Sequence, residues 1–184
     1  MYLEKYYIIN QQFMNMVGVY DRKAKLCTLV TQVDRKFFVD KSPLEIIEES
    51  IRFIGFGFDF KEATTASKFI LGDINMCPMM INHIHKICIF PDKAAKHGDT
   101  RWYNPLHIYR TTSYKGGTNI EHTNGQVLWV PIRLSSFNSK WKAADELRDI
   151  AVSIANNPIT FAFEPNRKRF NLVSRRKKKQ LSRK

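Results

Sequence analysis

Four side chains of the types that bind zinc lie within twelve positions of the sequence: Cys77, His83, His85 and Cys88. Cysteine thiolates and imidazoles are the usual protein ligands of zinc. If this stretch is extended, His83 and His85 point to one face and Cys88 to the other, and the spacing matches no structural zinc pattern well. Buried cysteines in strands and surface histidines explain the same residues, so we predict neither a metal site nor a cofactor.

The sequence motifs that carry catalysis in other proteins are missing here. Gly55-Phe56-Gly57 has no third glycine at position 60, and no GxxxxGK[ST], GxSxG or HExxH sequence occurs. A metal-dependent nuclease that used His83 and His85 with aspartates would need a pair of carboxylates, and none stands out from the surface charge. The sequence therefore predicts a protein that is not an enzyme.

The strongest chemical signal is positive charge near the C-terminal end. The 184 residues contain 30 Lys+Arg and 17 Asp+Glu, a net charge of +13, and ten of the basic residues but no acidic ones lie in residues 167–184. Because dense like charge opposes packing and attracts phosphate, this segment is expected to be a disordered tail that binds nucleic acid. Its candidate contacts are Arg167, Lys168, Arg169, Arg175, Arg176, Lys177, Lys178 and Lys179.

The rest of the chain has the composition of one globular domain. It is close to neutral, and the whole sequence is 43% hydrophobic, enough to build a core at this length. Three cysteines without a CxxC pair are typical of a reducing compartment. No signal sequence or long apolar run is present, so we predict a cytoplasmic protein that does not bind a membrane.

Local patterns predict the elements that would position these residues. The sequence Ser42-Pro43-Leu44-Glu45 is a capping box at the start of a helix, and apolar stripes indicate helices at about 43–54 and 139–156. Short strands are expected at 6–9, 14–20, 26–32, 36–39, 79–81, 84–90, 106–113, 118–123, 126–132 and 159–163. We predict an α+β fold, mostly antiparallel β-sheet with two main helices, with a domain at 1–166 and the tail at 167–184.

Two segments receive more specific interpretations. Asn124-Gly125 predicts a type I′ hairpin in which Ile120 faces Trp129 and His122 faces Val127. The strand after this turn is apolar on both faces, which indicates that it is covered on both sides, by a helix on one of them. Residues 56–60 alternate aromatic with small or acidic side chains, and this pattern fits either a strand or a packed loop.

One stretch resembles a known family. Residues 37–47, FFVDKSPLEII, with Ser50, Arg52-Phe53 and Gly55 after them, are similar to the bacterial competence transcription factor family, ComK. The similarity continues in the same order across residues 10–150. It includes 78–81, 87–91, Trp102, His107, the Asn124-Gly125 turn, Pro131-Ile132 and Ser136-Phe137.

This resemblance implies a function. Family members are cytoplasmic, nucleoid-associated activators of genes for DNA uptake and recombination. They bind paired AT-rich boxes through the minor groove as dimers or tetramers, and RNA polymerase is their expected partner. The basic tail departs from the family pattern. Phe161 and Pro165 match the segment through which a Clp protease adaptor recognises such regulators, which implies the same contact here.

Cations near the predicted ends of elements are the candidate DNA contacts within the domain: Arg52, Lys115, Arg133, Lys140 and Lys142. The alternative is a nonspecific RNA- or ribosome-associated protein. In that case the same tail would bind phosphate, and exposed aromatic residues such as Trp102 and Tyr103 would stack on unpaired bases.

Overall fold

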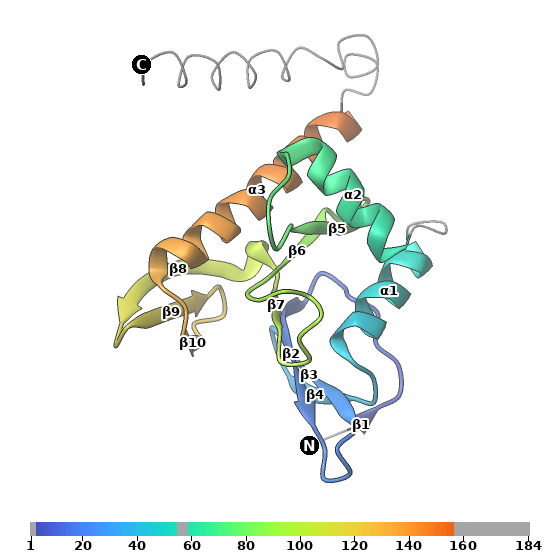
Figure 1. Cartoon of the computed structure of the whole chain (residues 1–184), viewed down its shortest axis with the longest axis vertical. Helices are drawn as coiled ribbons and strands as arrows, with labels where there is room; N and C mark the ends of the chain where they lie inside the picture. Colours follow the sequence, from blue (N-terminus) through green and yellow to red (C-terminus); the bar gives the residue numbers. More distant parts are fainter. Residues whose placement is uncertain (1–2, 55–58, 157–184) are drawn as a thin grey trace. The chain divides into compact units, whose positions relative to one another are not determined.

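The computed structural model describes residues 3–54 and 59–156, and these contain two β-sheets and three helices. The larger sheet has seven strands in the order β1-β4-β3-β2-β7-β6-β5 (Figure 1). All neighbours in this sheet are antiparallel except β1 and β4, which are parallel. Its strands are β1 (Leu3–Glu4), β2 (Phe13–Tyr20), β3 (Leu26–Gln32), β4 (Lys36–Val39), β5 (Met79–Asn82), β6 (Ile87–Pro91) and β7 (Arg101–Tyr103).

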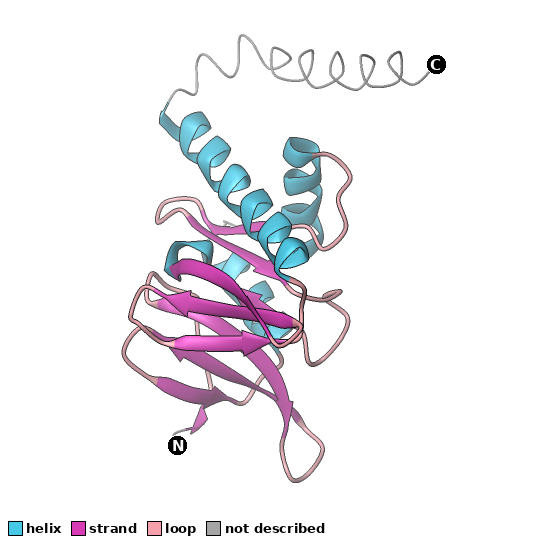
Figure 2. Cartoon of the chain, turned by 90° about the vertical axis from the view of Figure 1, so that its left-hand side faces the viewer, coloured by secondary structure: helices cyan, strands magenta, loops and turns pink. Residues whose placement is uncertain are grey.

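The smaller sheet follows the larger one along the chain. A short 3-10 helix, Pro105–His107, leads into three antiparallel strands in the order β10-β9-β8. Their bounds are β8 (Ile108–Tyr114), β9 (Gly117–His122) and β10 (Val127–Val130). Figure 2 brings these strands to the front. Residues up to Ile150 form one compact unit.

The prediction of two main helices is wrong, because the described residues contain three. The helix α1 (Pro43–Ile54) has the predicted bounds, and α3 (Leu134–Asn156) begins five residues before the predicted start at 139. The third helix, α2 (Phe60–Leu71), was not predicted. It begins at Phe60, the last residue of the ambiguous segment 56–60, and residues 56–58 of that segment lie outside the described residues.

Capping boxes begin the first two helices. At α1 the Ser42 amide donates to the Glu45 carboxylate at 2.7 Å, and the Glu45 amide donates to the Ser42 hydroxyl at 3.3 Å. At α2 the amides of Asp59 and Glu62 donate to each other's carboxylates at 3.0 and 2.7 Å. The Asp59 cap is therefore the signal that marks the start of the unpredicted helix.

The core lies between the larger sheet and the first two helices. The helix α1 packs on β2 and β5, and α2 packs on β5. An aromatic group of Tyr7, Phe13 and Phe37 fills one part of this core, with the ring centroids of Tyr7 and Phe37 5.4 Å apart. Trp102 meets Phe60 edge to face elsewhere in it. The helix α1 adds Ile46, Ile47 and Ile51 to the same core, so its apolar face covers the sheet.

Several predicted strands are confirmed and others are corrected. The strands β3 and β4 match their predictions residue for residue, whereas residues 6–9 form no strand, and β6 begins at Ile87 after a turn instead of at 84. The strands β1 and β7 were not predicted. Because β7 lies in the interior of the larger sheet, Trp102 and Tyr103 are buried, and they are not the exposed aromatic residues that the RNA alternative requires.

The predicted register of the β9–β10 hairpin is wrong by one residue. The His122 amide donates to the Gln126 carbonyl at 2.8 Å, so three residues form the loop, and of these only Gly125 has a positive φ, +79°. Trp129 pairs with Asn119 instead of Ile120. A slip of one residue exchanges the two faces of a strand, and Val127 and Trp129 are exposed. The strand order also places β10 at the edge of its sheet, so the prediction that it is covered on both sides is wrong.

Candidate nucleic-acid interface

The smaller sheet has one face turned toward the protein and one turned to solvent. Strand pairing places Thr111, Ile120 and Leu128 side by side on the inner face. The opposite face, called the outer face below, contains side chains from all three strands: Arg110, Thr112, Tyr114, Asn119, Glu121, Val127 and Trp129. An antiparallel sheet commonly has one packed and one solvated face, but a solvated face usually carries fewer large apolar groups.

Large side chains on the outer face are unusually exposed. Val127 is 62% exposed, Tyr114 48% and Trp129 47%, and the neighbouring Tyr109 is also exposed. The Trp129 indole lies against the backbone of β9, because a Cβ atom on Gly117 would come within 2.9 Å of its Cε2 atom. Its Nε1 atom donates to the Tyr114 carbonyl at 3.1 Å. The ring is thus held in place while much of its surface remains accessible.

Two cations accompany these aromatic residues. Arg110 pairs with Glu121 across the strands. Lys115 is exposed at the turn between β8 and β9, and its Nζ atom lies 5.2 Å from the centroid of the Tyr114 ring. Lys115 and Gly116 both have positive φ values, +47° and +75°, which is the geometry of a type I′ turn. The tight turn predicted at Asn124-Gly125 is therefore found at the other end of β9.

The inner face anchors the sheet to the following segment. The Thr118 hydroxyl donates to the Ile132 carbonyl at 2.6 Å, and the Thr111 hydroxyl bonds to the Asn138 side chain of α3 at 2.7 Å. Phe137 is fully buried, with its ring centroid 5.6 Å from that of Phe90 and 5.2 Å from that of Tyr103. The start of α3 therefore packs behind the smaller sheet and against the larger one.

A buried histidine connects the two sheets. The Nδ1 atom of His122 donates to the His107 carbonyl at 3.0 Å, and its Nε2 atom is 3.5 Å from the amide nitrogen of Asn15 in β2. The Asn15 oxygen in turn accepts from Arg101 at 3.0 Å. Burial lowers the pKa of His122, and both contacts fit the neutral imidazole, with Nε2 as the acceptor. This joint fixes the smaller sheet relative to β2.

The predicted contact residues of the domain lie on different elements of the fold. Lys115 is at the tip of the smaller sheet, and Arg133 is exposed just after β10. Lys142 is exposed on α3, and Arg52 is exposed on α1, 3.8 Å from Glu48. Lys140 is half-buried, donates to the Asp92 carbonyl and has its pKa lowered by burial, so it serves an internal contact. These five cations are therefore spread over α1, the β8–β9 turn, the segment after β10 and α3.

Several other predicted site residues lie outside the described residues. They are Arg167, Lys168, Arg169, Arg175, Arg176, Lys177, Lys178 and Lys179 of the tail, together with Phe161 and Pro165 of the segment that resembles the adaptor contact. The structure does not test their roles, and they remain predictions. The last predicted strand, 159–163, lies outside the described residues as well.

The cysteine and histidine cluster has the arrangement of buried cysteines and surface histidines. Cys88 is buried in β6 and Cys77 is buried just before β5, whereas His83 and His85 are exposed in the turn between these strands. Burial raises the pKa of both thiols, that of Cys77 to about 11, which disfavours the thiolate that zinc needs. Within residues 3–54 and 59–156, no three potential metal ligands gather.

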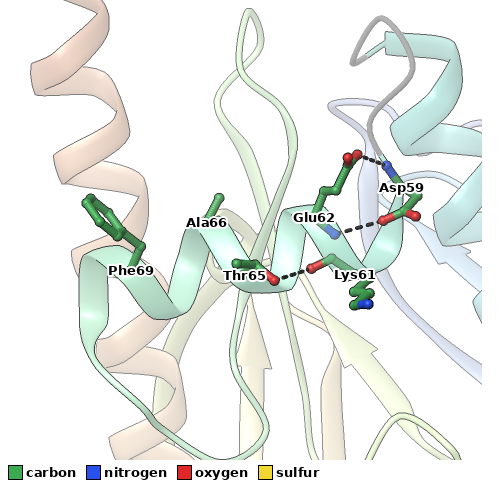
Figure 3. Close-up of a pocket in the computed structure, with 6 residues that line it drawn as sticks. All are labelled: Asp59, Lys61, Glu62, Thr65, Ala66 and Phe69. Carbon is green, nitrogen blue, oxygen red and sulfur yellow. Dashed lines mark hydrogen bonds between the residues drawn. The ribbon is translucent and has the colours of Figure 1, made fainter.

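An open pocket on α2 offers no comparable site. Its lining comes from one side of a single helix: Asp59, Lys61, Glu62, Thr65, Ala66 and Phe69 (Figure 3). The carboxylates of Asp59 and Glu62 are engaged in the capping box, and the Thr65 hydroxyl donates to the Lys61 carbonyl at 2.8 Å. The charged groups thus serve the helix itself.

Sequence reasoning missed the aromatic part of the outer face. Tyr109, Tyr114 and Trp129 were not singled out for binding, because the incorrect hairpin register placed Trp129 opposite Ile120 on a covered strand. The run Lys115-Gly116-Gly117 was the available signal, since its first two residues form the tight turn that sets the pairing of β8 with β9. That turn determines which side chains share the outer face.

The outer face thus combines exposed aromatic rings with neighbouring cations on an antiparallel sheet. The rings can pack on sugars or bases and the cations on phosphates. The ComK protein family model matches residues 3–153, so the chain belongs to this family. The competence transcription factor of Bacillus subtilis (strain 168) is 25% identical to it over 118 residues.

The match to that relative covers 63% of this chain and 60% of the relative, so the chain spans less than two thirds of the length of its curated relative. No solved structure matches the chain. In the part of the chain that the structure describes, no helix is long and apolar enough to cross a membrane.

Proposed function

We propose that this protein is a DNA-binding transcriptional activator of genes for DNA uptake and recombination. Membership of the ComK family and the name of the Bacillus subtilis relative support the general role. The structural observation that carries it is the outer face of the smaller sheet, where Tyr114, Val127 and Trp129 are exposed beside Lys115. A surface of this kind is costly in water and is typical of an interaction site.

The targets in this proposal are paired AT-rich boxes contacted in the minor groove, and the width of the sheet gives a physical reason for that preference. Strands lie about 4.8 Å apart, so three strands span roughly 10 Å, whereas the minor groove of B-DNA is only about 6 Å wide. The outer face fits only if the groove opens. Sequences with TA steps deform at low cost, and apolar side chains stabilise an opened groove.

The remaining parts of the chain have supporting roles in this proposal. Paired boxes call for a dimer or a higher assembly with matching symmetry, and an activator at a promoter acts together with RNA polymerase. The basic tail supplies affinity for phosphate irrespective of sequence. Replacing residues 175–179 with glutamine is therefore expected to weaken binding to box-containing and random duplexes by the same factor. Recognition of Phe161 and Pro165 by a Clp protease adaptor belongs to the same proposal.

The decisive test is a binding titration of the full chain on two duplexes of equal length. One carries two A-run/T-run boxes and the other is a GC-rich scramble, and each is measured at low and moderate salt. The proposal expects a preference for the boxes that persists at moderate salt. Equal affinities that fall together with salt would contradict it, and more efficient competition by RNA than by AT-rich duplex would favour the alternative of an RNA-associated protein.

A further inference from the structure

The turn between β2 and β3 is held in one conformation by a single carboxylate. The Asp21 Oδ1 atom accepts from the amides of Lys23 and Lys25, each at 2.8 Å. Backbone bonds join Asp21 to Lys25 at 2.9 Å and Ala24 to Asp21 at 3.1 Å. Ala24 has a φ of +59°, so this turn keeps a non-glycine residue in the left-handed region. The loop is therefore preorganised.

The cations at this turn are not all neutralised. Lys25 pairs with Asp40 at 2.7 Å, and this contact lowers the pKa of the Asp40 carboxyl. Asp21 is engaged by the backbone amides of the turn. Arg22 and Lys23 are exposed, and no described residue forms an ion pair with either of them. The tip of the hairpin thus presents two unpaired cations beside the single carboxylate of Asp21.

A second loop adds charge near the turn end of the same hairpin. Gly98 lies so close to β2 that a Cβ atom on Gly18 would be 1.8 Å from its carbonyl oxygen. A Cβ atom on Gly98 would be 3.0 Å from the Tyr20 hydroxyl. The loop also exposes Lys96, which has no ion pair within the described residues, whereas its acid Asp99 pairs with Lys93.

We infer that Arg22, Lys23 and Lys96, called the tip patch below, bind the phosphates of duplex DNA at a place separate from the outer face of the smaller sheet. Asp40 and Asp99 are paired with Lys25 and Lys93, and the three cations of the patch outnumber the remaining carboxylate of Asp21, so the field at this surface is positive. A turn that is already ordered loses little entropy when it binds. This inference rests on the proposed function, because it names a second contact with the same DNA.

The first experiment measures how strongly salt weakens binding. Arg22→Gln/Lys23→Gln is compared with Lys5→Gln/Lys61→Gln, a control that also loses two exposed cations, at a series of salt concentrations on box-containing and scrambled duplexes. Each phosphate contact contributes about 0.9 to the slope of log K against log salt. The Arg22→Gln/Lys23→Gln variant is expected to lower the magnitude of this slope by about 2 and to weaken binding to both duplexes by the same factor. The control variant is expected to keep the wild-type slope.

The outcomes separate this inference from the proposed function. If the wild-type protein prefers the boxes but the Arg22→Gln/Lys23→Gln variant has the same salt slope as the control, the inference about the tip patch is wrong and the proposed function is retained. If wild type shows no preference for the boxes, the proposed function fails. The inference would also be overturned if Arg22 and Lys23 were needed for binding to anionic lipid vesicles but not for binding to DNA. Thermal unfolding of each variant confirms that it is folded.

Asp21→Ala provides a test in which charge and geometry have opposite effects. The substitution removes a negative charge, so electrostatics alone would tighten DNA binding. It also removes both side-chain bonds that hold the turn, so a preorganised contact would weaken. We expect weaker binding with Arg22 and Lys23 still present. Tighter binding would overturn the role of the locked turn.

Discussion

The two sheets of this protein use similar residues for opposite purposes. In the larger sheet β5 and β6 are buried along their whole length, and Trp102 and Tyr103 of β7 are inaccessible to solvent. In the smaller sheet β8 is mostly exposed, and the aromatic residues Tyr114 and Trp129 face water. The difference shows that aromatic content alone does not mark a binding surface. What covers each sheet face decides whether its rings form a core or an interface.

Removing a ring from the larger sheet should have the largest effect on stability. Phe37 is buried and packs against Tyr7, so Phe37→Ala is expected to lower the free energy of unfolding by about 3–5 kcal/mol. Tyr109 of the smaller sheet is exposed, so Tyr109→Ala should change the free energy of unfolding by less than about 0.5 kcal/mol. Urea denaturation followed by circular dichroism measures both values. Similar losses for the two variants would contradict the contrast between the sheets.

Removing a ring from the outer face should instead affect DNA binding. Trp129→Ala is expected to weaken binding to the box-containing duplex by about 10- to 100-fold, since aromatic anchors at the centre of an interface dominate its affinity. Phe53→Ala is a suitable control, because Phe53 is 78% exposed on α1, away from the smaller sheet. A titration of both variants gives the comparison. Equal affinities would mean that the outer face does not touch DNA.

Gly117 tests whether the position of the Trp129 ring matters. A Cβ atom there would lie 2.3 Å from the Val130 carbonyl oxygen and 2.8 Å from Trp129 Nε1, so Gly117→Ala must displace β10 or the ring. We expect a loss of about 1–3 kcal/mol in stability and weaker DNA binding. Thermal unfolding and the same titration measure the two effects. Unchanged values in both would show that β10 moves without cost.

The joint between the sheets should be sensitive to acid. Because burial lowers the pKa of His122, the folded state binds a proton there less readily than the unfolded state. This site contributes its full stability above the ordinary histidine pKa of about 6.5, and the contribution is lost as the pH falls below that value and through the lowered pKa of the folded state. Unfolding measured between pH 7.5 and 5.5 should show a shallower pH dependence in His122→Asn than in wild type. Identical slopes would refute the assignment of a neutral His122.

Elements with strong local signals were predictable. The capping box at Ser42 and the apolar spacing after it determine α1, and charged or polar groups that bound short apolar runs determine β3 and β4. The third helix has an equally clear cap at Asp59, but Thr64 and Thr65 weaken its helical pattern. The three-residue β7 is too short to show an alternating pattern, so its burial could not be inferred.

Residue order and local preference were enough to predict the ComK family, the α+β class, the first helix and the concentration of basic residues near the C-terminal end. Which aromatic residues are exposed depends instead on how the strands pair in the folded protein. Pairing of β9 with β10 in a register one residue from the expected one placed Trp129 on the outer face, and Asp21 hydrogen bonds fixed the turn that presents Arg22 and Lys23. Both depend on hydrogen bonds to backbone groups, which the pattern of apolar and polar residues describes only indirectly.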